Sequence, residues 1–223
     1  MWDRVFSPDS KLFTAIRKII DIVMIGITWL ICNVTLILGG PASAGLYYSM
    51  VKAVRCDRSY ALREFWSGVR QNFKKGLLIY VVLLVLGWAI FALDIQTIML
   101  YIAERTFPDA VFLIAFCLKL LLYFGIQMWV YPLLSRFEGG AFKVLYSAFL
   151  TMLRNIHKTF LGGILAILGI LVCLYMPLLV LIVPGIVAFF MSYLVEPYLR
   201  RLCWDKQVDG GQTEHADPWY LET

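Results

Sequence analysis

Five polar side chains lie within long apolar stretches of the sequence, and they are Asn33, Asp94, Lys119, Gln127 and Glu196. An unpaired polar group is costly inside a bilayer, so such residues usually pair with each other, line a water-filled path or bind an ion or solute. If the apolar stretches cross a membrane, these five residues form the candidate intramembrane polar site of the protein.

Lys119 is the most informative of the five. If the apolar stretches that flank residues 103–109 form a helical hairpin, Asp94 and Lys119 lie at similar depths and can form an ion pair. Two alternatives remain, in which Lys119 extends towards the membrane surface or binds an anionic solute. Glu196 precedes Pro197 and can pair with Arg200 or another basic neighbour in a structural role.

The sequence gives little support to catalysis. Its only histidines are His157 and His215, and it contains no H-E-x-x-H, P-loop, G-x-S-x-G or dinucleotide-binding motif. No nucleophile is placed beside a base, and the five cysteines are scattered without a C-x-x-C pair. We therefore expect a protein that is not an enzyme, with no catalytic residues, no cofactor and no metal site.

The composition predicts a membrane protein. Hydrophobic residues make up 61% of the chain and charged residues 16%, and the mean hydropathy is +0.78. A typical soluble domain is about half apolar and about a quarter charged. We expect an all-α polytopic transmembrane helical bundle over residues 1–204 and a disordered cytoplasmic tail over residues 205–223. The basic residues fit a membrane topology, so we expect no nucleic-acid partner.

Five stretches are long enough to be strong spans, at about 20 apolar residues each; they cover roughly 19–38, 76–100, 110–134, 160–176 and 185–202. Gly39-Gly40-Pro41 ends the first of them, because proline lacks an amide donor and glycine is flexible. The short helix that follows, residues 41–54, would be only about 21 Å long. It is therefore either a short tilted span or a re-entrant helix.

The positive charges favour one topology. Cytoplasmic segments of membrane proteins carry an excess of Lys and Arg. If the chain leaves through the first span and returns through residues 41–54, all of the twenty Lys and Arg residues except Arg105 and Lys119 are cytoplasmic. This predicts a multi-pass protein of the bacterial cell membrane with both termini in the cytoplasm. In the alternative, residues 41–54 lie at the surface and the N-terminus is outside.

Two cytoplasmic segments, residues 59–73 and 139–158, are predicted to form amphipathic helices. In the first, Leu62, Phe65, Trp66, Val69 and Phe73 recur at helical spacing, and Arg63 and Arg70 lie on the other face. Such a basic face is typical of a helix that contacts anionic lipid. It could instead bind a partner protein, and the candidate docking residues are Arg63, Trp66, Arg70, Lys74 and Lys75.

The segments that lead into two of the spans are alike. Val69-Arg70-Gln71-Asn72-Phe73-Lys74-Lys75 resembles Met152-Leu153-Arg154-Asn155-Ile156-His157-Lys158. This similarity indicates either a duplicated, two-half arrangement, as in some transporters, or the ordinary composition of a basic helix that enters a membrane.

Several of these motifs together resemble the YesL-like family of bacterial membrane proteins of unknown function. They are Trp29-Leu30, Gly39-Gly40-Pro41-Ala42-Ser43-Ala44-Gly45-Leu46-Tyr47-Tyr48, Phe65-Trp66, Asn72-Phe73-Lys74-Lys75 and Tyr131-Pro132-Leu133-Leu134-Ser135-Arg136-Phe137-Glu138. Members are often found in carbohydrate-uptake contexts, so the resemblance implies an accessory role in sugar import. It supplies no catalytic or binding residues.

Taken together, the sequence predicts a non-enzymatic integral membrane protein, accessory or regulatory to a carbohydrate transport system. Its expected partners are the lipid bilayer and a subunit of a sugar transporter, and a homo-oligomer is compatible with the sequence. The alternative is a small-solute carrier or channel, which predicts a polar cavity lined by Asn33, Lys119 and Gln127.

Overall fold

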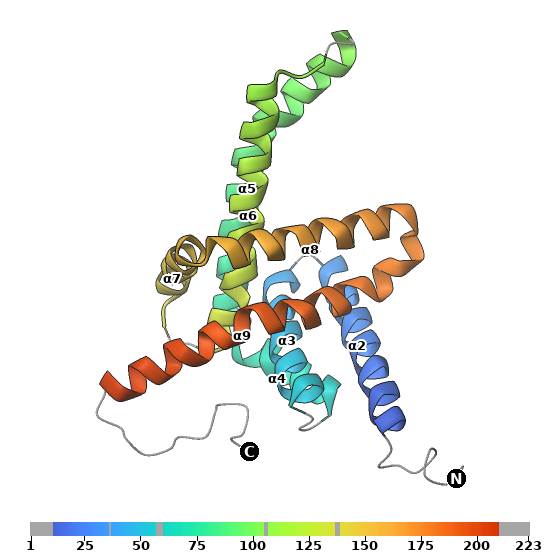
Figure 1. Cartoon of the computed structure of the whole chain (residues 1–223), viewed down its shortest axis with the longest axis vertical. Coiled ribbons are helices and arrows are strands. Elements are labelled where there is room, and N and C mark those ends of the chain that lie inside the picture. The colour runs from blue at the N-terminus through green and yellow to red at the C-terminus, as the bar shows by residue number, and fades with distance from the viewer. Residues whose placement is uncertain (1–10, 36, 57–59, 105–106, 137–138, 210–223) are drawn as a thin grey trace.

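Helices make up the fold, and their order is shown in Figure 1. The computed structural model describes residues 11–35, 37–56, 60–104, 107–136 and 139–209. The helices are α2 (Lys11–Val34), α3 (Gly39–Ser49), a π-helical turn η1 (Met50–Arg55), α4 (Ala61–Gln71), α5 (Phe73–Glu104), α6 (Ala110–Leu134), α7 (Ala141–Arg154), α8 (Ile156–Tyr175), a 3-10 turn η2 (Pro177–Leu181) and α9 (Val183–Asp209). No strand occurs within these ranges, which confirms the prediction of an all-α protein.

Three helices are long and apolar enough to cross a membrane, and they indicate a membrane protein. These are α5, α6 and α8, whose most apolar stretches have mean hydropathies of 2.7, 2.1 and 2.0. The predicted total of five strong spans is not confirmed. The helices at the other two predicted spans, α2 and α9, carry more charge. Helix α2 contains Arg17, Lys18 and Asp21, and α9 contains Glu196 and Arg200.

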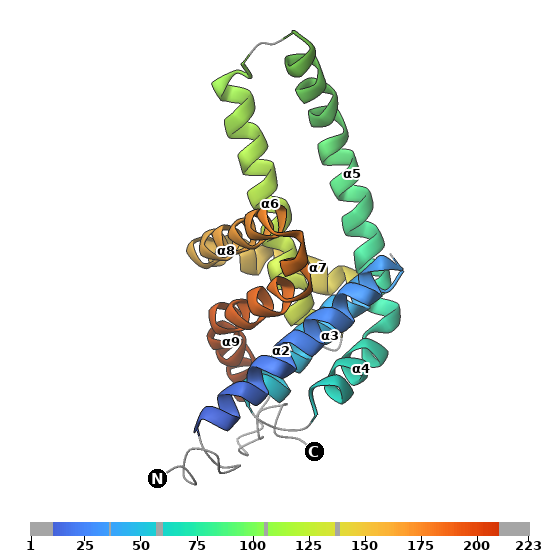
Figure 2. The same ribbon diagram turned by 90° about the vertical axis from the view of Figure 1, so that its right-hand side faces the viewer.

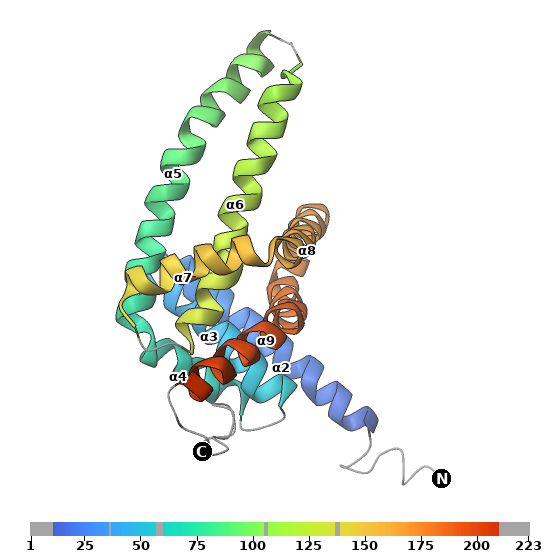
Figure 3. The ribbon, with the colours of Figure 1, turned by 60° about the vertical axis from the view of Figure 1, so that its left-hand side comes forward.

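The apolar helices do not all run in one direction. Helices α5 and α6 form a long hairpin, whereas α8 and α9 form a second hairpin that runs across the first (Figures 1 and 3). The predicted transmembrane bundle of five strong spans and one short helix would place these hairpins side by side. Helix α9 also continues to Asp209, past the start of the tail predicted from residue 205; residues 210–223 lie outside the described part of the chain.

Helices α3 and α4 form a tightly packed antiparallel hairpin. A Cβ added at Gly68 would lie 3.0 Å from the Gly45 Cα, and one added at Gly40 would lie 2.2 Å from the Gly76 carbonyl oxygen. The start of α3 therefore meets the start of α5, near the end of α2 (Figure 2). Small residues allow this close approach of the backbones.

The sequence leaves residues 41–54 either as a short tilted span or as a re-entrant helix, and whether they cross a membrane stays a prediction. Because α4 folds back along α3, the chain returns to the level at which it entered α3 before α5 begins. Lys52 lies near one end of the hairpin, against Glu64, and Lys74 and Lys75 lie at the other end, before Gly76. The basic residues between 52 and 75 thus lie towards both ends of the hairpin, and their cytoplasmic placement stays a prediction.

The corner before α5 is repeated before α8. The side-chain amides of Asn72 and Asn155 donate hydrogen bonds of 3.1 Å to the carbonyl oxygens of Gly68 and Thr151, four residues earlier. The backbone carbonyl oxygens of the same asparagines accept hydrogen bonds from the backbone amides of Gly76 and Thr159. The similarity of the two segments is therefore structural as well as sequential, while duplication of two whole halves stays a prediction.

Candidate functional site

A buried ionic cluster joins three parts of the chain at Glu196. The Glu196 carboxylate is fully buried and accepts hydrogen bonds from the Tyr47 hydroxyl (3.0 Å) and the Arg200 Nε (3.2 Å). It also forms a close ion pair with Arg136, whose side chain is only 2% exposed. The predicted pairing of Glu196 with Arg200 or another basic neighbour is confirmed. With three donors on its two oxygens, this carboxylate is held as a structural link rather than left available as a base.

Neighbouring cations extend this cluster along η1. The Arg55 guanidinium donates a hydrogen bond of 3.0 Å to the Ser192 carbonyl oxygen and lies 4.4 Å from the centre of the Tyr193 ring. Lys52 forms an ion pair of 3.2 Å with Glu64 of α4. Burial lowers the pKa of Lys52, but its contacts with Tyr48 and Glu64 outweigh that effect and hold the pKa above its usual value. These contacts tie η1 to both α9 and α4.

Asp94 and Lys119 form the predicted ion pair between α5 and α6. The Lys119 Nζ lies 2.8 Å from the Asp94 Oδ1. The Asp94 side chain is 6% exposed and that of Lys119 is 39% exposed, so the carboxylate is the more buried partner. The second Asp94 oxygen is buried and accepts no hydrogen bond from the described residues. The pair fixes the register of the long α5–α6 hairpin.

Replacing Lys119 by methionine is expected to lower the free energy of unfolding by about 1–2 kcal/mol, because it leaves the buried Asp94 without its cation. The double variant, Asp94→Asn with Lys119→Met, should recover most of that loss. Thermal unfolding in detergent of the single and double variants measures both effects. Additive losses in the double variant would show that the two side chains are not energetically coupled.

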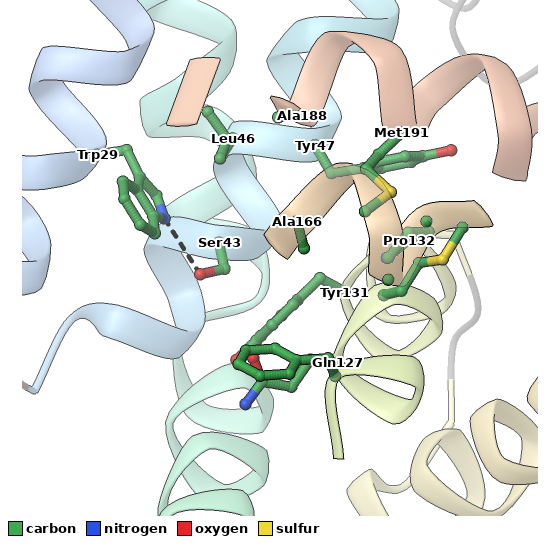
Figure 4. Close-up of a pocket in the computed structure, with 14 residues that line it drawn as sticks. Trp29, Ser43, Leu46, Tyr47, Gln127, Tyr131, Pro132, Ala166, Ala188 and Met191 are labelled. Carbon is green, nitrogen blue, oxygen red and sulfur yellow. Dashed lines mark hydrogen bonds between the residues drawn. The ribbon is translucent and has the colours of Figure 1, made fainter. Parts of the chain in front are cut away.

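A central cavity of about 220 Å³ lies where α2, α3, α6, α8 and α9 meet (Figure 4). Gln127 lines it together with Ser43 and Tyr131, and most of the remaining lining is apolar. The Trp29 indole donates a hydrogen bond of 3.1 Å to the Ser43 hydroxyl, which in turn donates one of 2.7 Å to the Gly39 carbonyl oxygen. The cavity is therefore a largely apolar chamber with a short polar wall.

The three residues predicted to line a polar cavity, Asn33, Lys119 and Gln127, do not meet at the central cavity. Of the three, only Gln127 lines it. Lys119 forms its ion pair with Asp94. The Asn33 amide donates a hydrogen bond of 2.9 Å to the Trp29 carbonyl oxygen of its own helix. Ser43 and Tyr131, which do reach the cavity, were not among the predicted residues, because a serine and a tyrosine in apolar helices are common and give no distinct signal.

The exposed face of α4 carries both of its arginines. Arg63, Trp66 and Arg70 are exposed and surround a shallow surface hollow with Ser67 and Gln71. Lys74 is also exposed, and Lys75 is half-buried. The predicted division of this helix is partly wrong, since Phe65 and Val69 are buried against α3 whereas Trp66 lies with the arginines. A tryptophan flanked by two arginines is a composition typical of binding surfaces.

The described residues contain no candidate metal site, because no three His, Cys, Asp or Glu side chains lie close enough together there to hold a metal ion.

Comparison with known proteins relates part of the chain to one protein family. No curated protein and no solved structure matches the chain. The family described as "Protein of unknown function, DUF624", which YesL-like families carry, matches residues 22–95. The matched part runs from Ile22 within α2, through the α3–α4 hairpin, to Ile95 within α5, so over these residues the protein is similar to DUF624, a family of unknown function.

Proposed function

We propose that this protein is a non-enzymatic accessory or regulatory component of a membrane transport system. Its docking surface for a transporter subunit is formed by Arg63, Trp66 and Arg70 on the exposed face of α4, together with Lys74 and Lys75 at the start of α5. The proposal places the protein in the bacterial cell membrane as a multi-pass protein with both termini in the cytoplasm. The link to carbohydrate import comes from the resemblance to YesL-like proteins alone.

The observation that carries this proposal is the rigid mounting of an exposed tryptophan between two arginines. Trp66 is 43% exposed, although its neighbour Phe65 is fully buried. The rest of α4 is held against α3 by the Gly45 and Gly68 contacts and against η1 by Lys52 and Glu64. A helix whose backbone is already held in place loses little conformational entropy on binding, which favours affinity.

The alternative of a small-solute carrier or channel receives less support. A carrier needs a polar path across the protein, whereas the polar side chains lie apart. Asp94 and Lys119 form an ion pair on the α5–α6 hairpin. The Glu196 carboxylate is bound by Tyr47, Arg136 and Arg200. Gln127 lines a cavity whose surface is largely apolar. For this reason the docking proposal is preferred.

The test is site-specific photocrosslinking in native membranes. A photoreactive phenylalanine analogue replaces Trp66 and, as a matched control, the exposed Phe107 before α6. Crosslinked products are purified and identified by mass spectrometry. We expect a subunit of a carbohydrate transporter to be crosslinked from position 66 and not from position 107.

Charge reversal should then remove that product. Arg63→Glu with Arg70→Glu is expected to reduce crosslinking by about tenfold or more, because two charge-assisted contacts are lost. Thermal unfolding should stay unchanged, since both side chains are exposed. Products that contain only lipid or further copies of this chain would overturn the proposal.

A further inference from the structure

The central cavity adjoins a second hollow, an apolar groove between α6 and α8. The groove has a volume of about 500 Å³ and exposes no polar atom. Phe124 and Gly163 line both the groove and the cavity, so the two spaces lie side by side at that point. Gly163 keeps the junction between the groove and the cavity open, because it has no side chain. A Cβ added there would contact the Leu121 side chain, at 3.4 Å.

The groove is entirely apolar, whereas the central cavity has a few polar groups in its lining. The groove offers only hydrocarbon and aromatic surface, whereas the cavity presents the hydroxyls of Ser43 and Tyr131 and the amide of Gln127. The Tyr131 hydroxyl lies near Ser43, and Figure 4 shows Tyr131 and Gln127 reaching towards the same part of the chamber. An apolar channel that ends at a few hydrogen-bonding groups matches an amphiphile.

The described lining of the groove and the cavity carries no charged side chain, which favours a neutral ligand over an ionised one. No Asp, Glu, Lys, Arg or His lines either space among the described residues. Burying an ionised carboxylate or phosphate there would be costly, because no cation would compensate it. A neutral hydroxyl or ester can instead exchange hydrogen bonds with Gln127 and Tyr131.

We propose that the groove and the central cavity together bind one neutral, single-chain lipid, with its hydrocarbon chain between α6 and α8 and its hydroxyl or ester end in the cavity. This site is a further one, separate from the docking surface, since it shares no lining residue with the hollow on α4. Either proposal can therefore fail without the other.

The experiment uses a monoacylglycerol with a photoreactive group in its chain. The probe is added to the full-length purified protein in detergent, and the labelled peptides are mapped by mass spectrometry. We expect labelling to concentrate on the residues of α6 and α8 that line the groove, with unlabelled monoacylglycerol competing. An ionised fatty acid should compete at least about tenfold less well, since the cavity lacks a cation.

Two sets of variants test the two ends of the site. Gly163→Leu, which fills the junction, should reduce labelling by about tenfold, whereas Leu171→Phe, on the exposed part of α8 outside both spaces, should leave it unchanged. Gln127→Leu with Tyr131→Phe should weaken binding of the monoacylglycerol but not of a hydrocarbon probe that lacks its polar end. If Gly163→Leu does not fold, the Gln127→Leu, Tyr131→Phe variant still tests whether the polar end of the lipid lies in the cavity.

Labelling spread evenly over all exposed apolar helices, including the outer face of α5, would overturn the proposal. So would equal labelling of the wild type and the Gln127→Leu, Tyr131→Phe variant by the monoacylglycerol probe. In either case the groove would be ordinary lipid-facing surface.

Discussion

Replacing Glu196 by glutamine should lower the free energy of unfolding by about 3–5 kcal/mol, the usual cost of removing one partner from a buried ion pair. The reason is that Arg136 is 2% exposed and would lose its ion pair with Glu196. Tyr47 would also donate its hydroxyl hydrogen bond to a neutral amide or lose it, in place of a charged carboxylate. Thermal unfolding in detergent, with the wild type measured alongside, records the loss as a fall in Tm.

Arg200→Ala is the matched control for this prediction. Its side chain also binds Glu196, but it is 48% exposed and lies one helical turn away on the same helix. Exposed pairs at this spacing contribute only about 0.3–0.5 kcal/mol. If Glu196→Gln costs no more than Arg200→Ala, the cluster does not hold α3, α6 and α9 together, and the structural role assigned to Glu196 is wrong.

The cluster also shows where sequence reasoning reaches its limit. The charge of Glu196 within an apolar stretch was enough to predict that it must be paired. Its partners could not be identified, because Arg136 and Tyr47 are 60 and 149 residues away in the sequence. By contrast, Asp94 and Lys119 are 25 residues apart on two helices joined by a short turn, so their depth could be worked out from helix lengths.

Helix positions were largely predictable, but the packing of the helices was not. Apolar runs and the break at Pro177 are local signals, and most helices start and end close to the expected places. The break predicted at Gly39-Gly40-Pro41 lies earlier, because α2 ends at Val34 and these three residues begin α3. The path of α4 depends instead on which glycines meet. The contact of Gly45 with Gly68 folds α4 onto α3, and it turns Trp66 to the side of the arginines. Periodicity alone put Trp66 with Phe65 and could not detect that contact.

The crosswise arrangement of the two long hairpins is the other unpredicted feature. Each hairpin follows from its own apolar stretches and its own turn. The hairpins meet where glycines of one helix pack closely against the other, as Gly125 of α6 does against Thr159 of α8 and Gly162 of α8 does against Met128 of α6. In apolar surroundings, hydrophobicity does not select one helix pairing over another, so close packing at small residues decides it.

Gly40→Ala is the second variant for which we expect a large effect, a loss of about 3 kcal/mol in the free energy of unfolding. The added Cβ would lie 2.2 Å from the Gly76 carbonyl oxygen and 2.5 Å from the Tyr80 Cβ. Since one of these contacts is with backbone, no side-chain rotation relieves it, and α3 has to move away from α5. Gly40→Leu should prevent accumulation of folded protein in the membrane altogether.

Gly163→Ala is the matched control, and its effect should have the opposite sign. Gly163 is also inside a helix, but its added Cβ would meet only the Leu121 Cδ1, at an ordinary 3.4 Å. Alanine is favoured over glycine in a helix by up to about 1 kcal/mol, so this variant should be slightly stabilised. Unfolding in detergent compares the two directly. If Gly40→Ala is as stable as Gly163→Ala, the start of α3 does not pack closely against the start of α5.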